Sequence, residues 1–390
     1  MFRPGEGEKR TRRGRPNTRM NRLTSWLIPL ALLASASSAQ AAAPEGRRMA
    51  FVVKDWFTSI YETKFQDECP EGMSTANDEF WWRKTSPEQR AKLTGNGMIQ
   101  ALNRFGVSVN QGDNKENVCL QPDSVKRPRM RTVEGPTSYG MNLDGTTDGK
   151  ATPKSCAHTK FVAPDGTPGI DNQLYRLVGC TYGWRKNVGT VDANANEMRG
   201  TSGLGMILIE ITDVDDTKND DDVTVTFYRS VDQWVQDSGG SPLPFSTYSI
   251  DMVDGKPRYG DSAKGRIKDG AIETKAADVR LPFYGNYNFM HPVIKDMQLK
   301  LHPVADGTKA HGMVAGYYSL ADFQYYIGGL GGVIPVNGID CPSVIQEAAR
   351  LADGYPDPKT GQCTALSSAF DIEAYAAFVR HPKTERTAQR

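Results

Sequence analysis

Segments in which apolar and polar residues alternate fill the second half of the chain, and they limit its fold more than any other feature. Val223, Val225 and Phe227 alternate with threonine and tyrosine, the period-2 pattern of a half-buried strand. Residues 206–211 form a nearly continuous apolar run, which is typical of a strand buried on both faces. Residues 297–302 repeat the alternation. Short, regular strands of this kind predict an antiparallel β protein.

One turn between these segments is clearly marked. Asp269 and Gly270 separate residues 266–268 from residues 271–274, and this residue pair suits the positive φ angles of a two-residue hairpin turn. No β-α-β rhythm and no internal repeat is visible. The sequence therefore predicts a mainly β fold, with an antiparallel β-sandwich or jelly-roll-like core and α-helical N-terminal and C-terminal additions.

Helix signals flank the β segments. Ser86, followed by proline and three positions later by glutamine, has the pattern of a capping box. Asp340 is a candidate cap for a helix that ends at Gly354. Ser368 is a candidate start for a second helix, which Pro382 would stop.

These patterns divide the chain into five parts. They are a signal peptide with an upstream extension (1–41), a mixed α/β N-terminal region that packs on the core (42–135), a β-sandwich domain (136–335), a disulfide-stapled helical hairpin (336–380) and a disordered tail (381–390).

The first 41 residues have the features of a cleaved export signal. Arg22 gives a positive start, residues 26–34 an apolar core, and residues 39–41 a small-residue cleavage site. Translation begins at either Met1 or Met20, a choice that the sequence leaves open. The apolar core is too short to anchor the protein in a bilayer. We therefore expect a periplasmic or extracellular protein with no transmembrane anchor after cleavage.

Loss of this segment changes the net charge. The whole chain carries +1, and residues 1–41 carry eight basic and two acidic residues, a net of +6, so the remainder carries −5. A mildly acidic protein is not drawn to nucleic acid or to anionic lipid. We therefore expect no nucleic-acid partner.

All six cysteines lie after the predicted cleavage site. An even number in an exported chain predicts disulfides. Six cysteines allow fifteen pairings, and the sequence cannot choose among them. Their spacing favours bridges between neighbours: Cys69–Cys119, Cys156–Cys180 and Cys341–Cys363. No C-x-x-C motif occurs, which makes metal binding or haem attachment a poor alternative.

An acidic, glycine-rich stretch carries the best candidate for a ligand site. Asn142, Asp144 and Asp148 place oxygen-bearing side chains at even spacings, and Asp171 follows in a second such turn. Hard cations such as Ca²⁺ take six to eight oxygen ligands. The sequence therefore predicts a calcium site formed by these four residues, although the spacing is not that of an EF-hand. The alternative is a set of aspartate turns with solvated carboxylates.

Three segments in this region follow a recurring order: residues 141–145 (MNLDG), residues 169–174 (GIDNQL), and residues 207–211 with a later aspartate-rich turn. The order resembles that of an uncharacterised group of exported bacterial proteins, which share NLDG or DLDG, G-[IV]-D-N, an apolar strand and an aspartate-rich turn. The resemblance covers about residues 138–230. It implies an exported β protein and brings no assigned activity.

Aromatic residues are frequent late in the β region. Tyr284, Tyr287, Tyr317 and Tyr318 are candidates for stacking on sugar rings, and core packing is the alternative for each.

Two histidines are also of interest. His302 points outward from a predicted strand, and His311 lies about one strand later. The two residues are candidates for a metal-binding pair, with isolated histidines as the alternative.

Sequence signatures of catalysis are missing. The chain has no G-x-S-x-G, H-E-x-x-H, G-x-x-x-x-G-K-[ST] or G-x-G-x-x-G motif. We therefore expect a non-catalytic binding or envelope-surface protein, with a carbohydrate or an envelope component as its partner. The alternative is a carbohydrate-active hydrolase on a jelly-roll scaffold that uses paired carboxylates. The sequence leaves the ligand and the oligomeric state open.

Overall fold

The computed structural model describes residues 47–63, 67–74, 86–91, 118–125, 129–185, 189, 191–285, 288–329 and 340–382. The chain divides into two units, 1–44 and 45–390, and every described residue lies in the second. The predicted export segment, Tyr287 and residues 383–390 of the predicted tail lie outside the described ranges.

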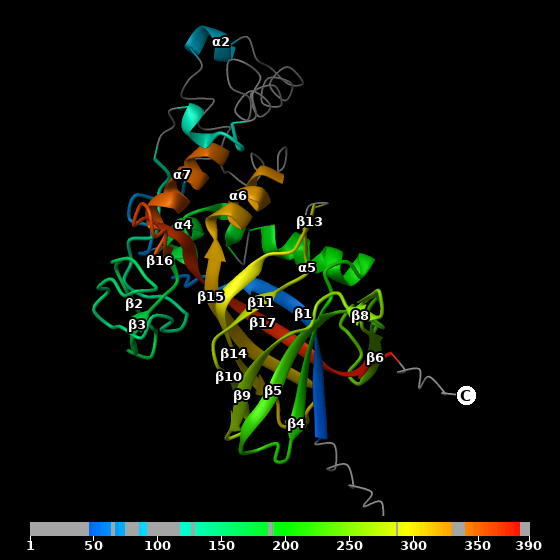
Figure 1. The fold of residues 1–390 in the computed structure, drawn as a ribbon. Helices are drawn as coiled ribbons and strands as arrows, with labels where there is room; N and C mark the ends of the chain where they lie inside the picture. Colours follow the sequence, from blue (N-terminus) through cyan, green and yellow to red (C-terminus); the bar gives the residue numbers. More distant parts are fainter. Residues whose placement is uncertain are drawn as a thin grey trace, which may run out of the picture. The chain divides into compact units, whose positions relative to one another are not determined.

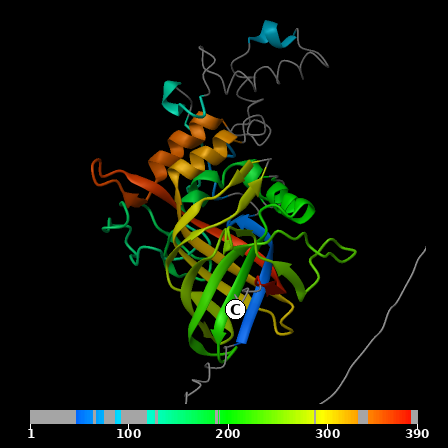
Figure 2. The ribbon, with the colours of Figure 1, turned by 45° about the vertical axis from the view of Figure 1, so that its right-hand side comes forward.

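Within these ranges, eight strands form an antiparallel sheet that closes on itself (Figures 1 and 2). In order around the barrel they are β1 (Arg47–Thr58), β4 (Ile207–Val214), β5 (Asp220–Arg229), β9 (Asp261–Lys268), β10 (Ala271–Thr274), β14 (Val293–Pro303), β15 (Lys309–Ser319) and β17 (Cys363–Arg380). The order around the barrel follows the chain, and the last strand pairs with the first, with Phe51 opposite Ala376. The topology is that of an up-and-down barrel.

Side chains fill the inside of the barrel. Phe51, Ile209, Val225, Ile272 and Ile372 point inward from five different strands, and each is at most 3% exposed. An eight-stranded barrel is just wide enough for its own side chains to fill. Burial of each such side chain contributes about 1.5–3 kcal/mol to stability.

The predictions of strands and of a mainly β, antiparallel fold are confirmed. Asp269 and Gly270, with φ angles of 51° and 82°, form the predicted turn between β9 and β10. The predicted sandwich is not what the sheet forms. Because β1 also pairs with β17, the sheet closes into one barrel instead of two packed layers.

Shorter strands extend or flank the barrel. They are β2 (Phe161–Val162), β3 (Pro168–Ile170), β6 (Ser246–Ser249), β7 (Met252–Val253), β8 (Lys256–Pro257), β11 (Ala277–Arg280), β12 (Phe283–Gly285), β13 (Asn288–Met290) and β16 (Gly354–Pro356). Strand β6 pairs in parallel with the end of β17. A second apolar cluster, which includes Val52, Leu208 and Tyr248, packs there outside the barrel wall.

Four helices gather at one end of the barrel in both views (Figures 1 and 2). They are α4 (Gln173–Val178), α5 (Val191–Ser202), α6 (Leu320–Gly329) and α7 (Cys341–Leu351); the remaining helical elements described are α2 (Pro87–Ala91), η1 (Pro122–Ser124) and η2 (Tyr182–Trp184). The carboxylate of Asp340 accepts a hydrogen bond from Ser343 N at 3.2 Å, which confirms the predicted cap of α7. Among the described helices, none has the length and apolar character needed to cross a membrane.

The prediction of a second C-terminal helix from Ser368 was wrong. Residues 363–380 form β17, the longest strand of the barrel. Most of residues 363–377 are buried. The barrel interior covers the inner face of this strand, and the segment at the start of α4 packs against its outer face. Burial on both faces removes the alternation that marks a strand in a sequence.

Three disulfides join Cys69 to Cys180, Cys119 to Cys341 and Cys156 to Cys363. The prediction that all six cysteines pair is confirmed, and each of the three favoured pairings was wrong. The bridges join residues 111 to 222 positions apart: Cys69–Cys180 lies within the long connection between β1 and β4, and the other two tie this connection to the C-terminal part of the chain. No bridge therefore staples α7 to the segment that begins at Cys363, and the predicted helical hairpin is not formed.

Candidate functional site

A long loop region, residues 136–172, lies against the outside of the barrel and brings charged side chains together. Gln173 N donates a hydrogen bond to Ser367 Oγ of β17 at 2.9 Å, and Ser155 pairs with Gly354. Asn172 caps helix α4 by accepting a hydrogen bond from Tyr175 N. These contacts fix the backbone just after Asp171 and hold the segment around Ser155 beside β16.

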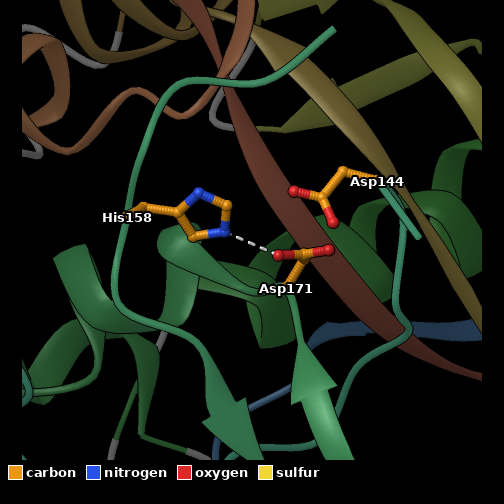
Figure 3. A group of neighbouring side chains, drawn as sticks. All are labelled: Asp144, His158 and Asp171. Carbon is orange, nitrogen blue, oxygen red and sulfur yellow. Dashed lines mark hydrogen bonds and ion pairs between the residues drawn. The ribbon is translucent and has the colours of Figure 1, made fainter. Parts of the chain in front are cut away.

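Three potential metal ligands meet in this region. One ligand atom each from Asp144, His158 and Asp171 lies within 4.8 Å of the other two. Figure 3 shows the three side chains directed toward one another, with His158 Nε2 at 2.7 Å from Asp171 Oδ1. We call these residues, together with Lys160 and Asp353, the ionic cluster.

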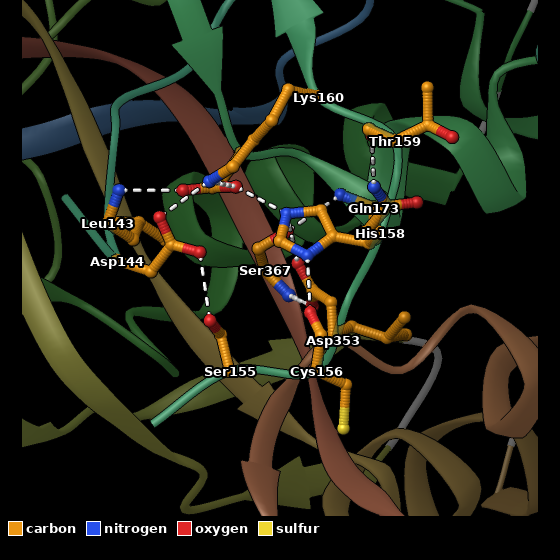
Figure 4. Close-up of polar contacts among 12 residues, drawn as sticks. Leu143, Asp144, Ser155, Cys156, His158, Thr159, Lys160, Gln173, Asp353 and Ser367 are labelled. Atoms are coloured by element: carbon orange, nitrogen blue, oxygen red, sulfur yellow. Dashed lines mark hydrogen bonds and ion pairs between the residues drawn. The ribbon is translucent and has the colours of Figure 1, made fainter. Parts of the chain in front are cut away.

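Lys160 lies between the two carboxylates of this group. Its Nζ donates hydrogen bonds to Asp144 Oδ1 at 2.6 Å and to Asp171 Oδ1 at 2.5 Å (Figure 4). The Lys160 side chain is 6% exposed, and both carboxylates are 0% exposed. The ammonium group therefore takes the position where a metal cation would neutralise the two carboxylates.

Asp144 is held in its ionised form. Its Oδ1 also accepts hydrogen bonds from the backbone and hydroxyl groups of Thr146, and its Oδ2 accepts one from Ser155 Oγ at 2.9 Å. Burial alone would raise the pKa of this carboxyl, but the hydrogen bonds, above all from Lys160, hold the pKa at about 2.

His158 joins the cluster to a third buried carboxylate. Its Nε2 lies 3.5 Å from Asp353 Oδ2, and its Nδ1 lies 2.8 Å from the carbonyl oxygen of Cys156. Burial raises the pKa of Asp353 to about 6. Burial acts to lower the pKa of His158, but the hydrogen bond to Asp171 and the nearby carboxylates raise it overall. With Lys160 and His158 charged, the cluster is neutral when Asp353 holds a proton.

The four predicted calcium ligands do not share one position. Asp144 and Asp171 share the Lys160 ammonium group, whereas Asn142 bonds within its own turn, to Gly145 N and the carbonyl of Thr146. Asp148 is exposed and pairs with Lys150. Calcium binding stays a prediction, and an ion between Asp144 and Asp171 would have to displace Lys160 Nζ.

Sequence reasoning did not identify Lys160 and Asp353 as partners of this site. Cys156, His158 and Lys160 occupy every second position of one segment; Cys156 forms a disulfide, and His158 and Lys160 join the cluster. Two basic residues at this spacing after a disulfide cysteine were the available sequence signal for the site. Asp353 comes from the other end of the chain, and nothing local indicates its position.

The candidate stacking tyrosines have different surroundings. Tyr317 is 1% exposed and Tyr318 is 8% exposed, so both rings lie in the protein interior. Tyr284 is half-buried, and its ring lies 6.0 Å from the ring of Phe289. Of the three described candidates, Tyr284 is the one whose ring remains partly open to solvent.

An apolar pocket lies at the helix-covered end of the barrel. Its walls come from four barrel strands, from β12 and β13, and from the neighbouring helices. They are formed by Trp56, Thr58, Leu174, Trp184, Asp192, Ala195, Arg199, Phe283, Tyr284, Met290, Ile294, Tyr318, Phe323, Tyr326 and Phe370. The space between them that admits a water-sized sphere is about 70 Å³.

Comparisons with protein-family models, with curated proteins and with solved structures gave no match. The description of the protein therefore rests on its own structure. It is a disulfide-bonded, antiparallel β-barrel protein with a buried ionic cluster on its wall and an apolar pocket at one end. The resemblance to exported bacterial proteins stays a prediction.

Proposed function

We propose that this protein is an exported, non-catalytic binding protein that takes a small apolar ligand into the pocket at the end of the barrel. Export rests on the predicted signal peptide, and the three disulfides agree with it because such bonds persist in oxidising compartments. The observation that carries the binding function is the lining of the pocket.

Aromatic rings from separate elements form most of the walls. The ring of Trp56 lies 5.3 Å from that of Phe283 and 5.4 Å from that of Phe370. Phe323 and Tyr326 of α6 close another side. Concave sites lined by apolar and aromatic groups, with few polar groups, are the usual form of small-molecule pockets.

Two charged residues, Arg199 and Asp192, give the pocket one polar side. Arg199 is 2% exposed, and its guanidinium donates to the carbonyl oxygens of Gly205 and Lys54, both at 3.1 Å. Burial lowers its pKa to about 10, so the group stays charged at neutral pH. Asp192 Oδ2 accepts a hydrogen bond from Thr58 N at 2.8 Å. A ligand with an apolar body and one polar end fits this arrangement.

The volume limits the size of the ligand. A dry apolar cavity of about 150 Å³ holds benzene, and a single water needs about 10–15 Å³ of this kind of space. The 70 Å³ pocket therefore suits a short alkyl chain, or the end of a longer molecule whose remainder lies in solvent.

The alternative function, hydrolysis of carbohydrates, requires two carboxyl groups beside the substrate. Asp192 is the one carboxylate in the pocket lining. Asp144 and Asp171 are buried and bridged by Lys160. The lining of this pocket favours binding over hydrolysis, and a carbohydrate or an envelope component as the natural partner stays a prediction.

Filling the pocket should weaken binding without changing the fold. Ala195 lies on the pocket wall, whereas Ala193 of the same helix is exposed. We expect Ala195→Leu to weaken the binding of 1-hexanol at least ten-fold, because the added carbons occupy the ligand space. Isothermal titration calorimetry measures this constant, with Ala193→Leu as the control that binds like the wild type. Equal affinities for all three proteins would refute the proposed site.

A further inference from the structure

Two exposed histidines face each other on the outer wall of the barrel. His302 of β14 and His311 of β15 are direct partners in the strand register. Their neighbours Leu301 and Gly312 belong to the inward face, where Leu301 is 0% exposed. Directly opposite residues on one face of an antiparallel pair have Cβ atoms about 4.5–5.5 Å apart. The two imidazoles therefore share one patch of surface.

A carboxylate on the next strand continues this row. Glu373 of β17 is the register partner of His311, and its Oε2 lies 3.6 Å from His311 Nδ1. Its other oxygen, Oε1, lies 3.6 Å from Lys54 Nζ. The Glu373 side chain is 24% exposed and that of His311 is 57% exposed, so both reach solvent.

The backbone beneath the row is fixed. The turn that joins the two histidine strands is closed by a hydrogen bond from Val304 N to the carbonyl oxygen of Lys309 at 2.9 Å. The carbonyl oxygen of Thr308 in the same turn accepts a hydrogen bond from Ala376 N of β17, also at 2.9 Å. The three strands are thus held in register, and binding a ligand would require rotation of the side chains of His302, His311 and Glu373.

We propose that His302, His311 and Glu373 form a binding site for one divalent transition-metal ion, with Zn²⁺ as the representative ion. Two imidazole nitrogens and one carboxylate oxygen are a ligand set that Zn²⁺ accepts, and water completes the tetrahedral shell. Imidazole ligands also suit Cu²⁺ and Ni²⁺, whereas Ca²⁺ and Mg²⁺ prefer oxygen alone. The site is independent of the apolar pocket and does not rest on its function.

Calorimetric titration of the tag-free, disulfide-bonded protein with zinc chloride tests this site. We expect one ion per chain. His302→Ala and His311→Ala should each weaken binding at least ten-fold, and Glu373→Gln should weaken it by a smaller factor.

His381→Gln is the matched control, because His381 also contacts a carboxylate, that of Glu210 at 2.9 Å, at a different place in the structure. It should bind zinc like the wild type. Zinc affinity that survives both alanine substitutions, or that disappears with His381→Gln instead, would overturn the assignment.

A second measurement separates lost binding from lost folding. A metal bound only by the folded protein raises its thermal unfolding midpoint. Zinc should raise the midpoint of the wild type and of His381→Gln, and should raise that of His302→Ala by a clearly smaller amount. An equal rise for His302→Ala would contradict the site even if that variant is less stable.

Discussion

Replacing Lys160 with methionine should lower the free energy of unfolding by about 3–5 kcal/mol, the typical cost of removing one partner from a buried ion pair. The substitution keeps most of the apolar stem and removes the charge that lies between Asp144 and Asp171. Both carboxylates have 0% exposed side chains, so water cannot replace the ammonium group. Denaturation by urea, followed by circular dichroism, measures the change.

Lys154→Met is the control for this experiment. Lys154 forms an ion pair with Asp296 at 2.8 Å, but its side chain is 64% exposed. Exposed pairs of this kind contribute about 0–1 kcal/mol. A second substitution, Asp144→Asn, should recover part of the loss in Lys160→Met because it removes one uncompensated charge. Equal small losses in both lysine variants would show that the ionic cluster does not stabilise the fold.

Removing the disulfide between Cys156 and Cys363 is the second change with a large expected effect. We expect the double variant Cys156→Ser, Cys363→Ser to lose about 2–5 kcal/mol of stability, the usual range for a native disulfide. The bridge spans 207 residues and ties the loop region of the ionic cluster to the start of β17. Its loss frees both the unfolded chain and this local attachment.

Loosening of the loop region can be measured separately from the loss of overall stability. Limited proteolysis of the native double variant should cleave within residues 143–160, where Asp144, His158 and Lys160 lie, at protease concentrations that leave the wild type intact. The variant's unfolding free energy comes from the same urea titration. A loss below about 1 kcal/mol together with unchanged proteolysis would contradict the role given to this bridge.

Most barrel strands could be predicted because one of their faces is exposed. Val223, Val225 and Phe227 alternate with polar residues, and Asp269 with Gly270 marks a turn that few other pairs can form. Strand β17 could not be predicted in this way, since both of its faces are covered and its alanines favour helix. Barrel closure depends on the pairing of β1 with β17, which no local pattern records.

The site was predictable only where its residues lie in recognisable turns. Asp144 and Asp171 were identified as members of glycine-rich acidic turns, and they do meet. The cation between them comes from Lys160, which lies outside those turns and was not identified as a partner of the two carboxylates. The disulfide partners depend on which loop crosses which strand, and spacing along the chain does not contain that information.

Methyl NMR of the isoleucine-labelled protein during a titration with 1-hexanol tests the central claim most directly. Ile294 lies on the wall of the pocket, and Ile272 is buried inside the barrel away from it. The proposed binding function predicts that the Ile294 methyl signal shifts with ligand concentration while that of Ile272 stays in place. An unmoved Ile294 signal at saturating ligand, or an equal shift of both, would contradict a binding pocket at this end of the barrel.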